Sequence, residues 1–408
     1  MFHPRRRRPP PGRRGSEAET IMRVGLIINY YDVSRGGVER YADTLTRSLL
    51  AAGHRVRVMA AGAKELPEGA ELVRVPELSF WSPVRTWTFA KSAERLLDRE
   101  RGRVDAVLGL ARVPHQDVFR VGGGSHKAHL LATKPWTATR AGSALIRLSP
   151  RHAALLAMER RILEGWREGR TLRYLCNARH VRDEIIADYG VPLDRIDVLH
   201  NPVNTERFDP ERWRSARGEA RRSLGVPEGA YVLLFAGSGF HRKGLDAALR
   251  AMAGAPRGAW LIVAGADDPG SYRAMARQLG VAGRVVFSGL RADIERMYAA
   301  ADAFLFPTRY DAFSNATLEA LAMGLPAITT QRNGASEVIT HGREGFVVDD
   351  PSDTAGLAQA LERLADPGLR MEMGQWARRR AQTLAPAPHA EAVIKLLEAA
   401  IVMRGGRA

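Results

Sequence analysis

The sequence predicts an α/β protein made of two doubly wound domains that face each other across a cleft. Short apolar runs, typical of buried parallel strands, alternate with longer amphipathic segments from residue 24 to residue 199. The same alternation starts again at residue 231 and ends at residue 402. Between the two halves, residues 200–204 (His-Asn-Pro-Val-Asn) have the composition of an interdomain hinge. Two parallel sheets joined in this way are expected to hold a ligand between the carboxyl ends of their strands.

The composition is that of a globular protein with an ample core. The chain has 408 residues, of which 45% are hydrophobic and 26% are charged, enough for two or three domains. No apolar run reaches the roughly 18 residues that a membrane-spanning helix needs, and no signal-peptide core lies near the start. Because Cys176 is the single cysteine, an internal disulfide and a cysteine zinc site are excluded. We therefore expect a cytoplasmic protein.

The net charge of +16 is concentrated in two places. Residues 1–21 contain six arginines and two glutamates in a Pro/Arg/Gly-rich sequence, which predicts a disordered basic leader or an upstream start that is rarely used. A domain is expected to begin at Met22. Residues 112–182 contain fourteen Lys or Arg against four Asp or Glu. Such local charge predicts an anionic partner, which is a membrane surface, a phosphorylated glycan or a nucleic acid.

Residues 134–170 combine this basic charge with an amphipathic pattern. Trp136 and Trp166 flank the segment, and arginines alternate with apolar residues between them. Basic residues and tryptophans in this arrangement are typical of helices that lie on an anionic membrane surface. The alternative is a domain helix whose arginine face is solvated.

Two glycine-rich turns of the first half follow expected strands. Gly36 and Gly37 come after the strand predicted at 24–29 and precede an amphipathic helix over 38–52. Residues 122–124 are three glycines, and Ser125 and His126 follow them, which leaves backbone room for a ligand. Close helix packing is the alternative explanation of the first turn, and an ordinary surface histidine is the alternative for His126.

A third glycine-rich turn opens the second half. The strand predicted at 231–236 is followed by residues 237–244 (GSGFHRKG) and by a helix over 245–252. Arg242 and Lys243 place two cations where small residues let the chain approach a ligand, which suits phosphate groups. The GxxxxGK[ST] spacing of a P-loop is absent.

Residues 302–330 are the most informative stretch, and they predict a strand, a loop, a helix and a strand. Ser314 or Asn315 is the expected N-cap of the helix over 316–323. Asp311 and Glu319 bracket the helix start, and the backbone N–H groups between them suit an anion. N–H groups that bind a phosphate, with a carboxylate on each side that accepts hydrogen bonds from hydroxyl groups, fit a nucleotide-sugar. The alternative is an ordinary βαβ crossover with solvated acids.

The second half resembles the C-terminal domain of retaining glycosyltransferases of family 4, which have the two-domain GT-B fold. The resemblance rests on residues 237–246 (GSGFHRKGLD), 288–330 and 344–353 (EGFVVDDPSD). The branch of lipopolysaccharide-core glucosyltransferases looks most similar. The resemblance implies an acceptor-binding domain over 22–203, against which residues 389–408 pack back, and a nucleotide-sugar-binding domain over 204–388.

The family has a Glu-x7-Glu motif, and this chain carries Asp311 and Glu319 at its two positions. The resemblance implies that Asp311 contacts the transferred sugar and that Glu319 binds the ribose hydroxyls. In the first domain it implies Asp117 or His126 as a polar group near the reaction centre. The donor-binding residues that it implies are Gly36, Gly37, Arg242, Lys243, Arg291, Phe313, Ser314, Asn315, Ala316 and Glu319.

The resemblance also implies a reaction that retains the anomeric configuration, by same-face attack on a nucleotide-diphosphate sugar. No Asp-x-Asp triplet occurs in the chain, so no metal ion or other cofactor is expected. UDP-hexose is the expected donor, with ADP-heptose as the alternative, and a lipid-linked glycan such as lipopolysaccharide core is the expected acceptor. The protein would bind the inner face of an anionic membrane through residues 134–170.

Two other classes of function remain open at this stage. One is a non-catalytic nucleotide-sugar-binding protein, in which Asp311 marks decay of the motif. The other is a nucleic-acid-binding protein, which would use the basic residues 112–182. No nucleic-acid-binding motif is present, and we expect no nucleic-acid partner.

Overall fold

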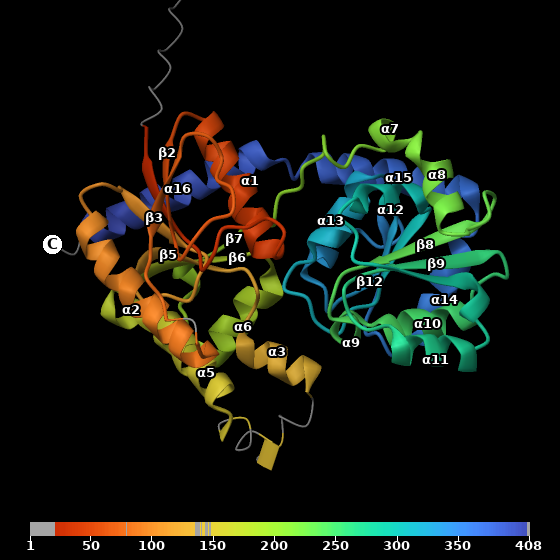
Figure 1. Ribbon diagram of the computed structural model, residues 1–408, viewed down its shortest axis with the longest axis horizontal. Helices are drawn as coiled ribbons and strands as arrows, with labels where there is room; N and C mark the ends of the chain where they lie inside the picture. Colours follow the sequence, from red (N-terminus) through yellow and green to blue (C-terminus); the bar gives the residue numbers. More distant parts are fainter. Residues whose placement is uncertain are drawn as a thin grey trace, which may run out of the picture.

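The computed structural model describes residues 21–78, 80–134, 139, 141–142, 146 and 148–405. Residues 1–20 of the leader predicted over 1–21, and Trp136 of the basic segment, lie outside these residues. Two domains stand side by side in Figure 1, and each contains a sheet flanked by helices. The sheets have seven and six strands in the described part of the chain. The predicted α/β fold with two doubly wound domains is confirmed.

The first sheet has the strand order β3-β2-β1-β4-β5-β6-β7, with every neighbouring pair parallel. The strands are β1 (Arg23–Ile27), β2 (Arg55–Ala60), β3 (Ala70–Arg74), β4 (Ala106–Gly109), β5 (Gln116–Val121), β6 (Thr171–Cys176) and β7 (Ile196–Val198). The helices are α1 (Gly37–Ala51), α2 (Ser82–Glu100), α3 (His126–Thr133), α5 (Pro150–Leu163) and α6 (Arg179–Tyr189), with short 3₁₀ helices η2 (Gly165–Glu168) and η3 (Leu193–Arg195). Every residue of β4 and β5 is buried, because the strands lie between two helical layers.

The second sheet has the order β10-β9-β8-β11-β12-β13 and is also parallel. Its strands are β8 (Tyr231–Ala236), β9 (Ala259–Ala264), β10 (Val285–Gly289), β11 (Ala303–Phe306), β12 (Ala327–Thr330) and β13 (Gly345–Val348). Its helices are α7 (Pro210–Trp213), α8 (Ala216–Ser223), α9 (Phe240–Lys243), α10 (Leu245–Ala253), α11 (Gly270–Gln278), α12 (Ile294–Ala300), α13 (Asn315–Ala322), α14 (Thr354–Arg363) and α15 (Pro367–Gln382), with η4 (Ala282–Arg284) and η5 (Gly334–Val338). The strand order reverses between β8 and β11, and this is where such sheets bind ligands.

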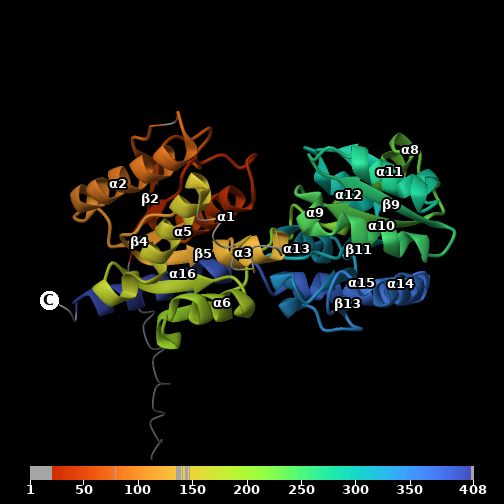
Figure 2. The same cartoon turned by 90° about the horizontal axis from the view of Figure 1, so that it is seen from below.

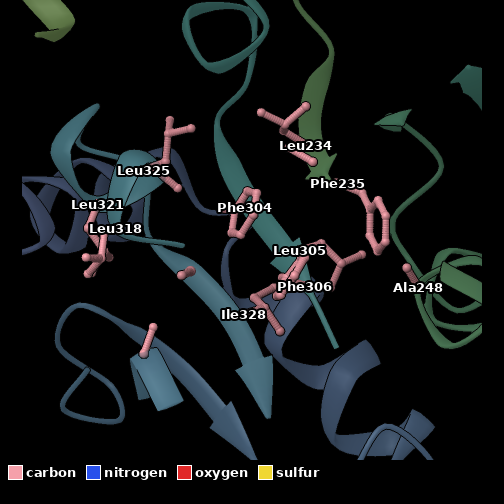
Figure 3. Packing of buried hydrophobic residues seen from close by; sticks show 14 of the residues in the cluster. Leu234, Phe235, Ala248, Phe304, Leu305, Phe306, Leu318, Leu321, Leu325 and Ile328 are labelled. Atoms are coloured by element: carbon pink, nitrogen blue, oxygen red, sulfur yellow. The ribbon is translucent and has the colours of Figure 1, made fainter. Parts of the chain in front are cut away.

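The core of the second domain is built on β11. Figure 3 shows Phe304 and Phe306 along β11 and Phe235 on the neighbouring strand β8. The ring centroids of Phe304 and Phe306 are 5.4 Å apart, and those of Phe235 and Phe306 are 5.7 Å apart. This aromatic packing holds the strand whose carboxyl end carries the loop of Asp311.

The last helix, α16 (Pro386–Gly405), returns to the first domain and lies along it in Figure 1 and Figure 2. Val393 and Leu397 are buried in the same apolar cluster as Leu26 of β1. The prediction that the C-terminal helix crosses back is therefore confirmed. Within the described residues, no helix combines the length and apolarity needed to cross a membrane.

Candidate active site between the two domains

The N-termini of two helices meet where the domains face each other. Helix α1 starts at Gly37, and α13 starts at Asn315 with Ser314 as its N-cap. A Cβ atom on Gly37 would lie 3.3 Å from Nδ2 of Asn315, so glycine permits this close approach. Asn201 of the predicted hinge donates from Nδ2 to Oδ1 of Asn315 at 2.8 Å. The unpaired N–H groups and dipoles of both helices favour an anion between them.

Asp311 lies at the carboxyl end of β11 and forms a buried ion pair with Lys243. The Lys243 Nζ donates to Oδ2 of Asp311, and Nη1 of Arg242 lies 3.5 Å from the same oxygen. Burial favours the neutral acid, but the charges of Lys243 and Arg242 outweigh it and hold the pKa of Asp311 below its ordinary value. Burial lowers the pKa of Lys243 against the opposing effect of Asp311. The site therefore holds one anion and two cations at the switch point of the sheet.

The loop around Phe313 is held in place by Asn333, a residue that was not among the predicted site residues. Oδ1 of Asn333 accepts a hydrogen bond from the Ser314 N–H at 3.2 Å, and its Nδ2 donates to Thr317 Oγ1 at 3.0 Å. The Phe313 ring stacks on His200 of the first domain with centroids 5.3 Å apart. The one sequence signal for Asn333 is the Asn-Gly pair that marks a turn after β12.

Glu319 is buried in the second turn of α13. Tyr298 donates from its hydroxyl to Oε2 of Glu319 at 2.9 Å, and Arg40 of α1 lies 3.5 Å from Oε1. Burial raises the pKa of Glu319 above its ordinary value, and Arg40 and Tyr298 act in the opposite direction. A cavity of about 350 Å³ opens beside it, and Asn315, Asn204 and Glu319 are among its lining residues. Neither Arg40 nor Tyr298 was a predicted site residue.

His126 is the first residue of α3, which lies against α9 of the second domain. Its Nε2 is 3.1 Å from Nδ1 of His152, and its backbone N–H donates to buried Glu159 at 2.6 Å. Burial and the positive charge of Arg112 lower the pKa of His126 to about 4, so the ring is neutral at pH 7. The sequence-predicted histidine is therefore placed at the domain boundary.

The domains also touch beside His126, where Tyr310 meets the first domain. Tyr310 donates from its hydroxyl to Oε2 of Glu184 at 2.9 Å, and the Ser125 N–H donates to the same oxygen at 3.3 Å. Burial raises the pKa of Glu184 to about 7. Because Tyr310 precedes Asp311 in the chain, this contact fixes one end of the Asp311 loop to the first domain.

The structure corrects the expectation that Asp117 lies near the reaction centre. Asp117 is the second residue of β5, at the amino end of the strand, whereas the cleft lies at the carboxyl ends. Its Oδ2 accepts from the Val107 N–H at 2.8 Å, and Arg404 of α16 lies 3.1 Å from Oδ1. Asp117 anchors the returning C-terminal helix, and His126 is the one of the two that the fold brings to the cleft.

Of the remaining predicted donor residues, Gly36 is the N-cap of α1 in the first domain, and the others lie around the second sheet. Arg291 follows β10 and forms a bidentate pair with Asp293, at 2.9 and 2.7 Å. Arg242 donates from Nη1 to the Tyr310 carbonyl at 2.9 Å, so it spans the same loop as Lys243. Ala316 accepts from the Tyr298 hydroxyl through its carbonyl oxygen at 3.0 Å. In the described ranges, no three His, Cys, Asp or Glu side chains are grouped as metal ligands, and metal independence stays a prediction.

Two parallel sheets that face each other, with the Asp311–Lys243 pair and Glu319 at the switch point of the second sheet, have the architecture of a glycosyltransferase of the GT-B class. Residues 216–380 match the family of glycosyl transferases group 1, and residues 35–207 match glycosyltransferase family 4. These two matches span most of the chain. The chain belongs to the glycosyltransferases that combine these two domains, and the predicted resemblance to family 4 is confirmed.

Individual relatives agree with this assignment. The chain is 28% identical over 358 residues to the lipopolysaccharide glucosyltransferase WaaG of Escherichia coli K12, covering 85% of this chain and 91% of WaaG. A crystal structure of WaaG, a glycosyltransferase involved in lipopolysaccharide biosynthesis, matches with a TM-score of 0.76 and 27% identity over 92% of this chain and 99% of that one. An uncharacterized glycosyltransferase of Methanocaldococcus jannaschii, MJ1607, is 27% identical over 82% of this chain and 87% of its own length.

Proposed function

We propose that the protein is a retaining glycosyltransferase that moves a hexose from a UDP donor to a lipid-linked glycan such as lipopolysaccharide core. The observation that carries the proposal is the Asp311–Lys243 pair beside the N-terminus of α13, with Glu319 further along the same helix. In a bound nucleotide-sugar, Asp311 would face the sugar, Lys243 and the N-terminus of α13 would face the diphosphate, and Glu319 would face the ribose. The similarity to WaaG, which is named as a lipopolysaccharide glucosyltransferase, supports the choice of acceptor.

The proposed reaction separates charge, and the site residues are arranged to stabilise both products of that separation. A nucleoside diphosphate leaves with its negative charge near Lys243, Arg242 and the N–H groups at Asn315. The sugar develops positive charge near the carboxylate of Asp311. Attack from the face of the departing phosphate gives retention, and a phosphate oxygen accepts the proton of the acceptor hydroxyl. In this scheme the cations of the chain take the place of a metal ion.

His126 and Glu319 have binding roles in this proposal. The His126 ring is neutral at pH 7 because its pKa is about 4, so it accepts or donates a hydrogen bond to a sugar hydroxyl without adding charge. Glu319 has two carboxylate oxygens that suit the two hydroxyls of a ribose. In the ligand-free structure these oxygens face Arg40 and Tyr298. The donor would replace the 3.5 Å contact with Arg40, which is the weaker of the two.

Calorimetric titration of UDP, ADP and GDP into the full chain tests the donor site. We expect one nucleotide to bind, with UDP favoured and ADP as the alternative. We expect Glu319→Ala to weaken that binding by about 1–3 kcal/mol, because two hydrogen bonds to a charged group are lost. Glu362→Ala on the exposed face of α14 is the matched control and should bind as the native chain does. If none of the three nucleotides binds, the transferase proposal fails.

We further propose that the protein works in the cytoplasm, bound to the inner face of the membrane through residues 134–170. In the described part of this segment, α5 carries Arg151, Arg160 and Arg161, and Leu148 just before it is 78% exposed. Basic side chains beside an exposed apolar residue suit an anionic lipid surface. The full chain should float with anionic vesicles at low salt and detach at high salt. Failure to bind such vesicles at low salt would contradict this part of the proposal.

A further inference from the structure

A small cavity lies in the first domain at the carboxyl ends of β1, β4 and β5, on the side of the cleft opposite Lys243. Its volume is about 190 Å³, and Asn29, Glu39, Arg112, Arg120, Gly122 and Glu159 are among the residues that line it. A single water needs about 10–15 Å³ of such space, so the cavity has room for an oxyanion together with water molecules. The proposed donor site does not use this cavity.

Arg120 is a buried cation without a buried anion beside it. The residue is 5% exposed, and its guanidinium stacks on the Tyr41 ring at 3.6 Å from the centroid. Nη2 donates to Oδ1 of Asn201 at 2.6 Å, while Nη1 lies at Gly122, where a Cβ atom would be 1.8 Å away. Among the described residues, no carboxylate forms an ion pair with Arg120. Buried guanidinium groups normally have such a partner, because removal from water is costly for an unpaired charge.

Arg112 is the second cation at this cavity, and it is half-buried. Within the described ranges it has neither a hydrogen-bond partner nor an ion-pair partner. Its charge acts on its surroundings: Arg112 lowers the pKa of His126 after the larger effect of burial, and the pKa of His129 after the larger effects of burial and Arg242. An anion placed between Arg112 and Arg120 would offset the positive charge of both side chains.

The two glutamates at the cavity do not neutralise these arginines. Glu159 is fully engaged, because its carboxylate accepts from the Ser125 hydroxyl at 3.4 Å, from the His126 N–H at 2.6 Å and from the Tyr189 hydroxyl. Glu39 lies in the first turn of α1, where the helix dipole favours its charge. No glutamate of the described chain is within ion-pair distance of Arg112 or Arg120.

We propose that this cavity is an oxyanion subsite, in which Arg112 and Arg120 bind a phosphate or carboxylate group carried by the acceptor glycan. Guanidinium groups suit both groups because they donate two parallel hydrogen bonds. The proposal rests on the glycosyltransferase function proposed above and specifies its acceptor as an anionic glycan. The subsite lies beside His126, so an anion bound there would hold the acceptor at the domain boundary.

Nuclear magnetic resonance of the His126 ring tests the subsite, with UDP present at saturation so that the donor site is already filled. Inorganic phosphate and acetate are the probes, and the His126 signals are identified by their loss in His126→Asn. We expect one of the probes to shift these signals saturably, with a midpoint on the order of 1 mM, as befits a small ion held by a few charged contacts. We expect the pKa of His126 to rise as the anion binds.

Three variants distinguish the subsite from general charge effects. Arg112→Gln should abolish the saturable shift and should raise the pKa of His126 even without a probe. Arg120→Gln should weaken binding at least tenfold, and if it does not fold, Arg112→Gln decides the question. Arg99→Gln removes an exposed arginine of α2, a helix of the same domain, and should leave the shift unchanged.

Two results would overturn the inference. One is an anion effect on His126 that is unsaturable or unchanged in Arg112→Gln. The other is a saturable effect that disappears when UDP fills the donor site, because the cavity would then belong to the donor. Calorimetry with UDP alone reports the proposed function separately, so failure of the subsite and failure of the transferase assignment give different results.

Discussion

Gly124 lies where the two domains touch, and Gly124→Ala is expected to break that contact. The backbone of Gly124 has a φ of +72°, and a Cβ atom there would lie only 1.8 Å from the hydroxyl oxygen of Tyr310. The Tyr310 ring would have to move by more than an ångström. Its 2.9 Å hydrogen bond to Glu184 could not survive this shift, and the Asp311 loop would lose its attachment to the first domain.

The expected cost has two parts. Alanine in the left-handed region costs about 1 kcal/mol. Loss of a hydrogen bond to a charged group costs about 1.5–3 kcal/mol, and Glu184 is charged at pH 8 because its pKa is about 7. We therefore expect Gly124→Ala to lower the free energy of unfolding by about 2.5–4 kcal/mol at pH 8. If the substitution separates the two domains without unfolding them, part of this free energy is seen as a lower rate of sugar transfer.

Urea denaturation at pH 8, together with initial rates of donor turnover, measures both effects. Gly123→Ala is the matched control, because a Cβ atom at Gly123 would meet no atom within 4 Å and its φ is not positive. The control should match the native chain in its free energy of unfolding. The reasoning is refuted if Gly124→Ala matches Gly123→Ala in both stability and turnover.

Three further outcomes are expected. Lys243→Met should leave Asp311 buried without its partner and cost about 3–5 kcal/mol of unfolding free energy, measured in urea. In a double-mutant cycle, the addition of Asp311→Asn should restore much of this stability, whereas the UDP affinity measured by calorimetry should stay low. Folding raises the pKa of Glu184, so its contribution to stability is present below about pH 4.5 and is lost as pH rises through about 7. Between pH 5 and pH 8 the native chain should therefore lose about 1–3 kcal/mol of unfolding free energy relative to Glu184→Gln. Equal pH profiles of the two proteins would contradict this. Arg404→Ala should remove the anchor of α16 at Asp117 and destabilise the first domain by about 1–3 kcal/mol in thermal unfolding, while UDP binding to the folded fraction stays normal; a loss of UDP binding would place Asp117 closer to the donor than the structure does.

Much of the donor side of the site could be predicted because its signals are local. The N-cap at Ser314, the helical period of α13 and the glycine-rich turn before α10 each depend on residues a few positions apart. The repeated β/α pattern determines that both domains are doubly wound and that their strands end at the cleft. The family resemblance then added the roles of Asp311, Lys243 and Glu319, which periodicity alone does not contain.

The contacts across the cleft depend on the path of the whole chain and are absent from any local pattern. Arg40 and Glu319 are 279 positions apart, and Tyr310 and Glu184 are 126 positions apart. Their pairing depends on how two independently folded sheets are set against each other, which involves the hinge and the returning helix α16.

Asp117 and His126 give a second example of what the local sequence does not determine and the tertiary structure does. The two residues are nine positions apart in the chain, and the sequence favours neither of them as the residue near the sugar. Strand β5 begins at Gln116, so Asp117 lies at its amino end and pairs with Arg404, whereas the chain reaches His126 after the carboxyl end. Because β5 runs parallel to β4 and β6, its carboxyl end faces the cleft, and the end that carries Asp117 faces away from it.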